Sequence, residues 1–126
     1  MQHEGDILVV DDEPTIAEFI IEALTDEGYV VRTALTAADA RAAIAERHPD
    51  LVLLDLHMPG KTGDVLARDL KNDGLADVPI IIMTADAQAT KSLAMEGIDY
   101  CLAKPFDLDE LIECVAKHIQ RNKVAT

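Results

Sequence analysis

The sequence predicts a doubly wound α/β fold, in which helices cover both faces of a parallel β-sheet. Short apolar runs recur along the chain, and segments with helical spacing of apolar residues separate them. This alternation is typical of parallel sheets, because consecutive parallel strands need a crossover that is usually a helix. The length of 126 residues fits one domain with one core. We therefore expect a single domain over residues 1–126, with a folded core at about 5–121.

The candidate strands are five short apolar runs, each bounded by polar or turn-forming residues. In chain order they are DILVV (6–10), YVVRT (29–33), LVLLD (51–55), PIIIM (79–83) and DYCLA (99–103). The third run ends in Asp55, and a Pro-Gly turn follows soon after it. A charged group at the end of a buried strand is costly unless another group pairs with it, so this aspartate is expected to have a partner.

Helices are predicted between the strands, which gives the element order βαβαβαβαβα. Apolar residues recur with a helical period at Ile16, Phe19, Ile20, Ala23 and Leu24, and again at Leu108, Leu111, Ile112, Val115 and Ile119. Boundary signals agree with this order: Pro14 suits a first helical turn, Thr36 with Asp39 and Asp107 with Glu110 resemble capping boxes, and Gly28 and Gly74 suit helix ends.

Composition excludes several classes of function. Asp and Glu number 24 against 11 Lys and Arg, so the net charge is −13 and the surface should repel nucleic acid and anionic membranes. No apolar run reaches the length of a membrane span, and the polar start MQHEGD is no signal peptide. Cys101 and Cys114 lack metal-ligand spacing and are expected to be reduced, buried or half-buried hydrophobes. These features favour a cytoplasmic location, without nucleic-acid binding or membrane insertion.

Chemistry-bearing residues gather at the ends of the predicted strands. Asp11 and Asp12 follow the first strand, Asp55 ends the third, Thr84 follows the fourth and Lys104 follows the fifth. In open α/β sheets, ligands bind beyond the carboxyl ends of the strands, where the winding reverses. Three carboxylates, one hydroxyl and one ammonium group should therefore meet at one edge of the sheet.

This set of groups suits phosphoryl transfer. Clustered carboxylates repel one another, and a hard divalent cation such as Mg²⁺ relieves that repulsion. An aspartate can act as a nucleophile towards phosphorus and form an aspartyl phosphate. The charge of the new phosphoryl group can be balanced by the metal and Lys104, while Thr84 can donate a hydrogen bond to it.

Four segments resemble, in order, those of the receiver domains of two-component response regulators. They are VDDEP (10–14), LLDLHMPGKTG (53–63), IIMTA (81–85) and LAKPF (102–106), and together they extend over most of the chain. One such segment is weak evidence, whereas all four at successive strand ends are highly specific. The resemblance implies a flavodoxin-like (βα)5 fold with strand order 2-1-3-4-5 and a cis peptide bond between Lys104 and Pro105.

The resemblance also implies a role for each site residue. Asp55 would be the phosphoacceptor, with Thr84 as the switch hydroxyl and Lys104 as the phosphate partner. Asp12 would bind Mg²⁺ directly. Asp11 would bind it directly or through water, and the backbone carbonyl of His57 would complete the protein ligands.

By the same resemblance, the chain is expected to be a stand-alone phosphorylation-controlled switch. It would take its phosphoryl group from a sensor histidine kinase or a histidine phosphotransfer protein. It would then regulate, relay to or compete for partner proteins, and it would catalyse only its own phosphorylation and dephosphorylation. The sequence does not identify the kinase or the downstream target.

Two other functions stay open at this stage. A phosphatase of the haloacid-dehalogenase type also uses Asp, Mg²⁺, Thr and Lys, but it usually has a second Asp where this chain has His57. A receiver that only binds a partner would not need the full set of acidic and basic residues.

Individual residues also have simpler interpretations. The acidic pair can be a solvated turn, Thr84 a helix cap and Lys104 a surface lysine. The side chain of His57 is expected in a partly exposed loop, and solvation is expected for His3, His48 and His118.

One position departs from the family. Receivers typically have an aromatic residue three positions before the lysine, where this chain has Cys101, and Tyr100 lies one position earlier. Because strand side chains alternate between faces, Tyr100 should point to the opposite side of the sheet, unless a bulge restores it. We therefore expect phosphorylation to move the loop after Thr84 and the following helix (89–97), without an aromatic switch. Asp86 and His57 are expected to flank the path of the water that removes the phosphoryl group.

Overall fold

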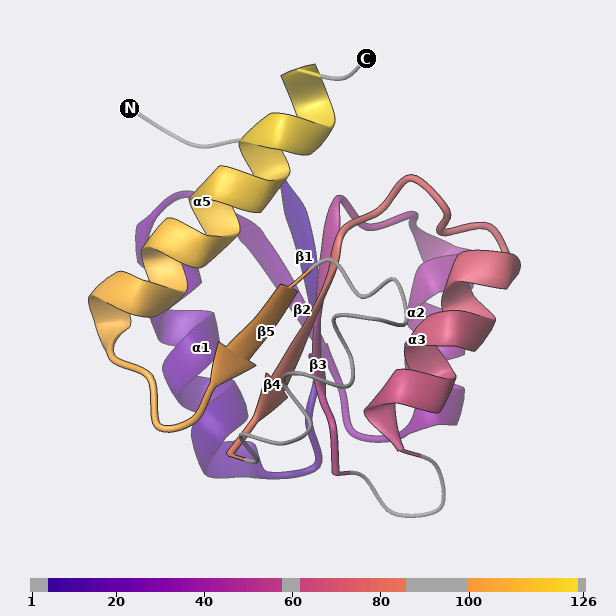
Figure 1. Ribbon diagram of the computed structural model, residues 1–126, viewed down its shortest axis with the longest axis horizontal. Helices are drawn as coiled ribbons and strands as arrows, with labels where there is room; N and C mark the ends of the chain where they lie inside the picture. The colour runs from indigo at the N-terminus through magenta and orange to yellow at the C-terminus, as the bar shows by residue number, and fades with distance from the viewer. Residues whose placement is uncertain (1–4, 58–61, 86–99, 125–126) are drawn as a thin grey trace.

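The computed structural model describes residues 5–57, 62–85 and 100–124 (Figure 1). The strands are β1 (Asp6–Val10), β2 (Val30–Ala34), β3 (Leu51–Asp55), β4 (Ile80–Thr84) and β5 (Tyr100–Ala103). The helices within these ranges are α1 (Pro14–Asp26), α2 (Ala37–Glu46), α3 (Gly63–Asn72) and α5 (Leu108–Val124). The helix expected at 89–97 and the residue Asp86 lie outside the described part of the chain.

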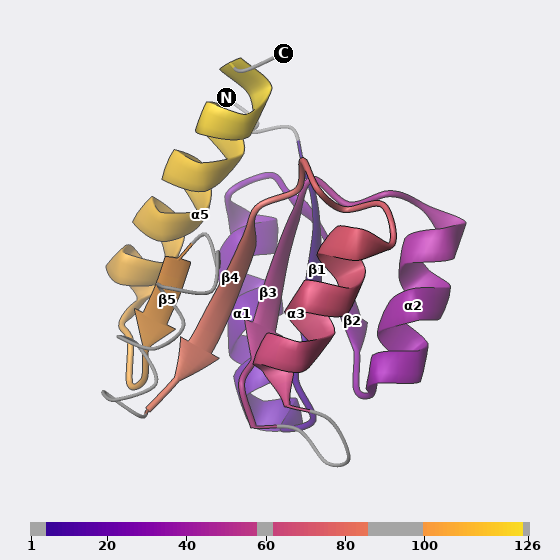
Figure 2. The ribbon, with the colours of Figure 1, turned by 45° about the vertical axis from the view of Figure 1, so that its right-hand side comes forward.

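All five strands form one parallel sheet in the order β2-β1-β3-β4-β5, as predicted. α1 and α5 cover one face of this sheet, and α2 and α3 cover the other (Figures 1 and 2). β1, β3 and β4 are buried along their whole length, which explains their nearly continuous apolar sequences. Their residues alternate between the two cores, so Ile7 and Val9 face α1 and α5, whereas Leu8 and Val10 face α2 and α3.

The predicted helix boundaries are confirmed. Pro14 opens α1, and Gly28 and Gly74 have positive φ angles of 95° and 123° just beyond helix ends. The Thr36 hydroxyl accepts a hydrogen bond from the Asp39 amide at 3.0 Å. The capping box at α5 is reciprocal: the Glu110 amide donates to the Asp107 carboxylate at 2.8 Å, and the Asp107 amide donates to the Glu110 carboxylate at 3.1 Å.

Three sequence predictions need correction. β2 and β4 lie one residue later than expected, and β5 is described from Tyr100, since residue 99 lies outside the described ranges. Phe19 is 41% exposed and lies outside the buried stripe of α1, where its ring faces that of Phe106 at a centroid distance of 6.4 Å. His118 is buried instead of solvated: its Nδ1 donates to the Cys114 carbonyl at 2.7 Å, and its ring lies 5.1 Å from that of Tyr100. His118 follows Leu111 by seven residues, which is the helical spacing of the buried face.

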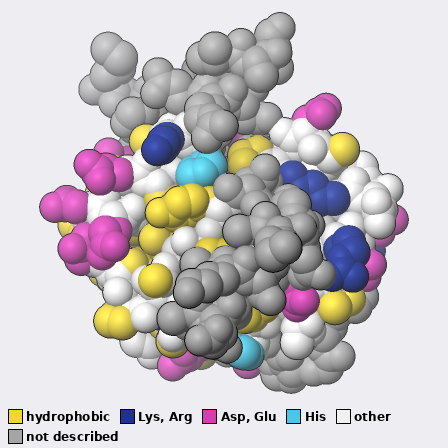
Figure 3. Space-filling view, viewed as in Figure 1, with side chains coloured by type: hydrophobic (Ala, Val, Ile, Leu, Met, Phe, Trp, Pro, Cys, Tyr) yellow, Lys and Arg dark blue, Asp and Glu magenta, His cyan; other side chains and the backbone are white. Residues whose placement is uncertain are grey.

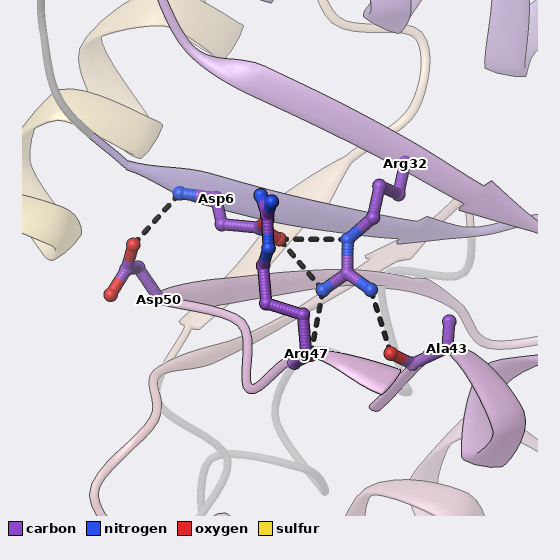
Figure 4. Close-up of polar contacts among 5 residues, drawn as sticks. All are labelled: Asp6, Arg32, Ala43, Arg47 and Asp50. Carbon is purple, nitrogen blue, oxygen red and sulfur yellow. Dashed lines mark hydrogen bonds and ion pairs between the residues drawn. The ribbon is translucent and has the colours of Figure 1, made fainter. Parts of the chain in front are cut away.

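An ionic network that the sequence did not predict closes the amino end of the sheet (Figure 4). The buried Asp6 carboxylate accepts hydrogen bonds from Arg32 at 2.7 and 3.0 Å and from Arg47 at 2.9 Å. Arg32 also donates to the carbonyls of Ala43 and Arg47, at 2.6 and 2.8 Å. The Asp50 carboxylate accepts a hydrogen bond from the Asp6 amide at 2.8 Å. Arg32 therefore binds β1 and the end of α2 at the same time.

The acidic composition is visible on the surface. In Figure 3, Asp and Glu side chains gather over the first turns of α5, where Asp109, Glu110 and Glu113 are exposed. Within the described ranges, none of the helices combines the length and the hydropathy that a membrane crossing needs.

Candidate functional site

Three aspartates meet at the carboxyl edge of the sheet. Asp11 and Asp12 follow β1, and Asp55 ends β3, its neighbour in the sheet. One carboxylate oxygen from each residue lies within 4.8 Å of the others. Asp11 and Asp55 are buried, whereas Asp12 is exposed. The structure thus brings together the three carboxylates that the sequence placed at this edge.

Asp11 is buried with one carboxylate oxygen that lacks a hydrogen bond within the described ranges. Its Oδ1 accepts a hydrogen bond from the Glu13 amide at 2.8 Å, but its buried Oδ2 has no hydrogen-bond partner among the described residues. Burial raises the pKa of Asp11, and the charges of Asp55 and Asp12 raise it further, while the Glu13 amide and Lys104 oppose the rise. A buried oxygen of this kind is costly to the fold unless a ligand satisfies it.

Lys104 supplies the cation that faces the acidic cluster. Its Nζ donates to Asp55 Oδ1 at 3.0 Å and lies 3.7 Å from Asp11 Oδ2. The Lys104 amide donates to the Thr84 carbonyl at 2.8 Å, which fixes the backbone of Lys104 to the end of β4. The Lys104–Pro105 bond is cis, as expected. One ammonium group thus faces three carboxylates, so the cluster keeps a net negative charge.

The remaining site residues lie nearby in the fold. Thr84 is buried at the end of β4, one residue beyond the partner of Asp55 in the strand register. His57 is exposed two residues after Asp55. The cluster suits a hard divalent cation, since it offers three carboxylates, one of which has a buried oxygen without a hydrogen bond among the described residues.

An apolar groove beside the site was not predicted. Its volume is about 570 Å³, and it is lined by Thr15, Ile16, Phe19, Ala85, Lys104, Pro105 and Phe106. The exposed face of α1 continues from this groove as an acidic row of Glu18, Glu22 and Asp26, at intervals of one helical turn. Phe19 has the helical spacing of the core residues of α1, so its exposure in this groove has no sequence signal of its own.

The structure answers the question raised by Tyr100. β5 pairs with β4 in unbroken register from Tyr100 to Ala103, so no bulge restores the aromatic residue to the usual position. Tyr100 packs against His118 on α5, whereas Cys101 packs on the side of α2 and α3. The predicted orientation of Tyr100 is confirmed. The predicted movement falls mainly on 86–99, outside the described residues.

Comparisons with known proteins agree with this geometry. A model of the response regulator receiver domain matches residues 7–116. The phosphate regulon transcriptional regulatory protein PhoB of Pseudomonas aeruginosa is 44% identical over 109 residues, which are 84% of this chain and 48% of that protein. The chain thus spans about half the length of this curated relative.

Solved structures show the same similarity. The receiver domain of NtrX from Brucella abortus has a TM-score of 0.85 and 34% identity, covering 91% of this chain and 98% of that one. A putative response regulator from Chloroflexus aurantiacus has a TM-score of 0.87 and 30% identity, covering 94% and 99%. The chain belongs to the response regulator receiver domains, which are signalling modules that accept phosphoryl groups from histidine kinases.

Proposed function

We propose that Asp55 accepts a phosphoryl group from a phosphohistidine on a sensor histidine kinase or a histidine phosphotransfer protein. The observation that carries this proposal is the environment of Asp55. Its buried carboxylate accepts a hydrogen bond from Lys104 at 3.0 Å and lies beside Asp11 Oδ2, which has no hydrogen-bond partner among the described residues. A nucleophilic carboxylate, a fixed cation and a second set of acidic ligands are the groups that aspartyl phosphorylation needs.

In the proposed reaction, a carboxylate oxygen of Asp55 forms a bond to phosphorus. The bond between phosphorus and the donor imidazole breaks, and its electron pair returns to the imidazole nitrogen, which takes a proton. Lys104 stays close to the acceptor and balances part of the negative charge that the phosphoryl group brings. Thr84, at the end of β4, would donate its hydroxyl hydrogen to a phosphoryl oxygen.

Mg²⁺ is the cofactor that we propose for the acidic cluster. Asp11, Asp12 and Asp55 would hold it, with the carbonyl of His57 as a further ligand. A bound Mg²⁺ supplies positive charge that neutralises phosphoryl oxygens during transfer. Asp11 Oδ2 supports this assignment, because it has no hydrogen-bond partner among the described residues and a metal ion would satisfy it.

The groove beside Lys104 is proposed as the place where the phosphodonor docks. Its apolar lining suits a hydrophobic side chain, and the acidic row of Glu18, Glu22 and Asp26 suits basic residues on the same partner. Partners of this kind would place the reaction in the cytoplasm. The transferred group would then control binding to a downstream protein or be relayed further.

The central experiment is incubation with acetyl phosphate and Mg²⁺, followed by intact-mass analysis. The wild type should gain one phosphoryl group, and Asp55→Asn should gain none because the nucleophile is removed. Asp26→Asn is the matched control, since it removes an exposed carboxylate from the far end of α1 and should be labelled normally. Equal labelling of Asp55→Asn and wild type would refute the proposed acceptor.

Docking is tested separately with Glu22→Lys. Reversing this charge should slow phosphotransfer from a cognate kinase about tenfold or more, since charge complementarity mainly governs the association rate. Labelling by acetyl phosphate, which needs no docking surface, should be unchanged. If Glu22→Lys accepts phosphate from the kinase as fast as the wild type does, the acidic row takes no part in docking.

A further inference from the structure

Gly63, the first residue of α3, packs directly on the backbone that carries Asp55. The Gly63 amide donates to the Leu56 carbonyl at 2.7 Å. A Cβ atom at Gly63 would lie 2.9 Å from Leu56 Cα and 3.1 Å from the Asp55 carbonyl carbon, and closer still to the Asp55 carbonyl oxygen. Gly63 is not among the glycines with positive φ, so any residue could adopt its backbone conformation. Space, and not conformation, requires glycine here.

Both sides of this contact are held in place. The three atoms that a Cβ would meet belong to the backbone, so no side-chain rotation can move them aside. The peptide of Leu56 is fixed to β4, because its amide donates to the Met83 carbonyl at 3.0 Å. α3 is held against the sheet by Leu66, Ala67 and Leu70, which are buried in the core. A side chain at Gly63 must therefore displace the helix, the Asp55 peptide, or both.

We propose that Gly63 is a positioning residue for phosphorylation: its lack of a side chain lets α3 fix the Asp55 peptide, and with it the carboxylate. This inference rests on the proposed role of Asp55 as acceptor. The carboxylate must keep its place beside Lys104 at 3.0 Å and within the cluster of Asp11 and Asp12. A misplacement of about 1 Å at a reacting group costs on the order of a hundredfold in rate.

The test compares Gly63→Ala with Gly74→Ala. Gly74 has a φ of 123° and no atom within 4 Å of an added Cβ, so alanine there strains the backbone without touching the site. Both variants should lose stability, but only Gly63→Ala should lose phosphorylation rate. We expect at least a tenfold loss with acetyl phosphate at saturating Mg²⁺, well below both melting temperatures. The Gly74 variant should keep the wild-type rate.

Two further readouts separate positioning from a general loss of structure. Mg²⁺ should bind more weakly to Gly63→Ala than to Gly74→Ala, since a displaced Asp55 leaves the carboxylate cluster. Gly63→Ser should match Gly63→Ala, because the obstructing atom is the Cβ that both variants share. If Gly63→Ala is unfolded in buffer, all variants are measured in sucrose, which favours the compact state.

The wild type provides a test that needs no variant. Addition of beryllofluoride and Mg²⁺ should shift the NMR signals of the Gly63 and Leu56 amides while leaving that of Gly74 in place. A wild-type phosphorylation rate in folded Gly63→Ala, or unmoved Gly63 and Leu56 signals, would overturn the inference. Failure of the wild type to accept phosphate would instead overturn the proposed function, so the two failures are distinct.

Discussion

Asp6 at the amino end of the sheet and Asp11 at its carboxyl end are both buried carboxylates, but their surroundings differ. Asp6 accepts three hydrogen bonds from two arginines, and one of them, Arg32, also donates to the carbonyls of Ala43 and Arg47 at the end of α2 (Figure 4). Asp11 has an oxygen without a hydrogen-bond partner in the described structure and shares Lys104 with Asp55. The chain neutralises its own charge at one end and leaves a negative site at the other.

This difference separates a structural charge from a functional one. A compensated carboxylate stabilises the fold only while its partners remain, and removal of one partner leaves the others buried and unpaired. A buried carboxylate that lacks hydrogen bonds destabilises the fold until a ligand binds. Because ligand binding removes this destabilisation, the ligand stabilises the folded state. Mutations at the two ends should therefore change stability in opposite directions.

The largest effect is expected for Asp6→Ala. It should lower the free energy of unfolding by about 3 kcal/mol, because Arg32 loses its carboxylate partner in a largely buried position. This value is the low end for breaking a buried ion pair, since water can still reach part of the Arg32 side chain. Urea denaturation should show a lower midpoint with an unchanged slope. Phosphorylation of the folded protein should persist. A loss below 1 kcal/mol would show that water can replace the carboxylate.

An opposite and smaller effect is expected for Asp11→Asn. This change removes a buried charge and should raise the free energy of unfolding of the metal-free protein by about 1 kcal/mol at neutral pH. Addition of Mg²⁺ at ten times its Kd should stabilise the wild type by about 1.4 kcal/mol and Asp11→Asn by much less. Thermal unfolding with and without Mg²⁺ checks both points. Equal stabilisation of the two proteins would remove Asp11 from the metal site.

The same variant has a defined pH dependence. The pKa of Asp11 is raised by burial above its ordinary value of 3.8, so the folded wild type binds more protons than the unfolded chain between these two values. Stability of the wild type therefore falls, relative to Asp11→Asn, as the pH rises through this window. The advantage of the variant should be complete above the raised pKa and should fade as the pH approaches 3.8.

The smallest effect is expected for Arg47→Ala. The Arg47 side chain is 61% exposed, and Asp6 keeps both bonds from Arg32 when it is lost. The free energy of unfolding should fall by about 0.5 kcal/mol, as for an exposed ion pair. A loss as large as that of Asp6→Ala would mean that the two arginines act as one unit, and a double-mutant cycle would measure that coupling.

The sequence predicted the capping boxes and the meeting of the acidic residues, because both follow from local signals, whereas the strand order was implied by the resemblance to receiver domains. Strand ends, turns and helix caps can each be recognised from a few consecutive residues. The parallel arrangement of the strands then brings strand ends that are far apart in the sequence to one edge of the sheet. Asp55 is an example: a carboxylate after an unbroken apolar run already implied a partner, and Lys104 is that partner.

What the sequence did not predict depends on the packing between elements. The bonds from Arg32 to Asp6 and Ala43 depend on how β2, β1 and the end of α2 come together. The surroundings of Phe19 depend on the segment just before α5, because Phe106 in that segment contacts the Phe19 ring. The burial of His118 does have a sequence signal, its helical spacing from Leu111; the lack of partners at ligand spacing, from which solvation was expected, does not bear on burial.

The strand order also has a consequence for folding. β1 lies between β2 and β3, so the first half of the chain can assemble three neighbouring strands, whereas β5 joins the sheet only beside β4. The contact between Asp11 and Asp55 needs only the pairing of β1 with β3, whereas Lys104 reaches Asp55 after β4 has paired with β3 and β5 has paired with β4. We therefore expect the three aspartates to converge before their lysine arrives. During that interval the three carboxylates repel one another without the lysine to balance them. Mg²⁺ in the refolding buffer should therefore accelerate folding of the wild type more than that of Asp11→Asn.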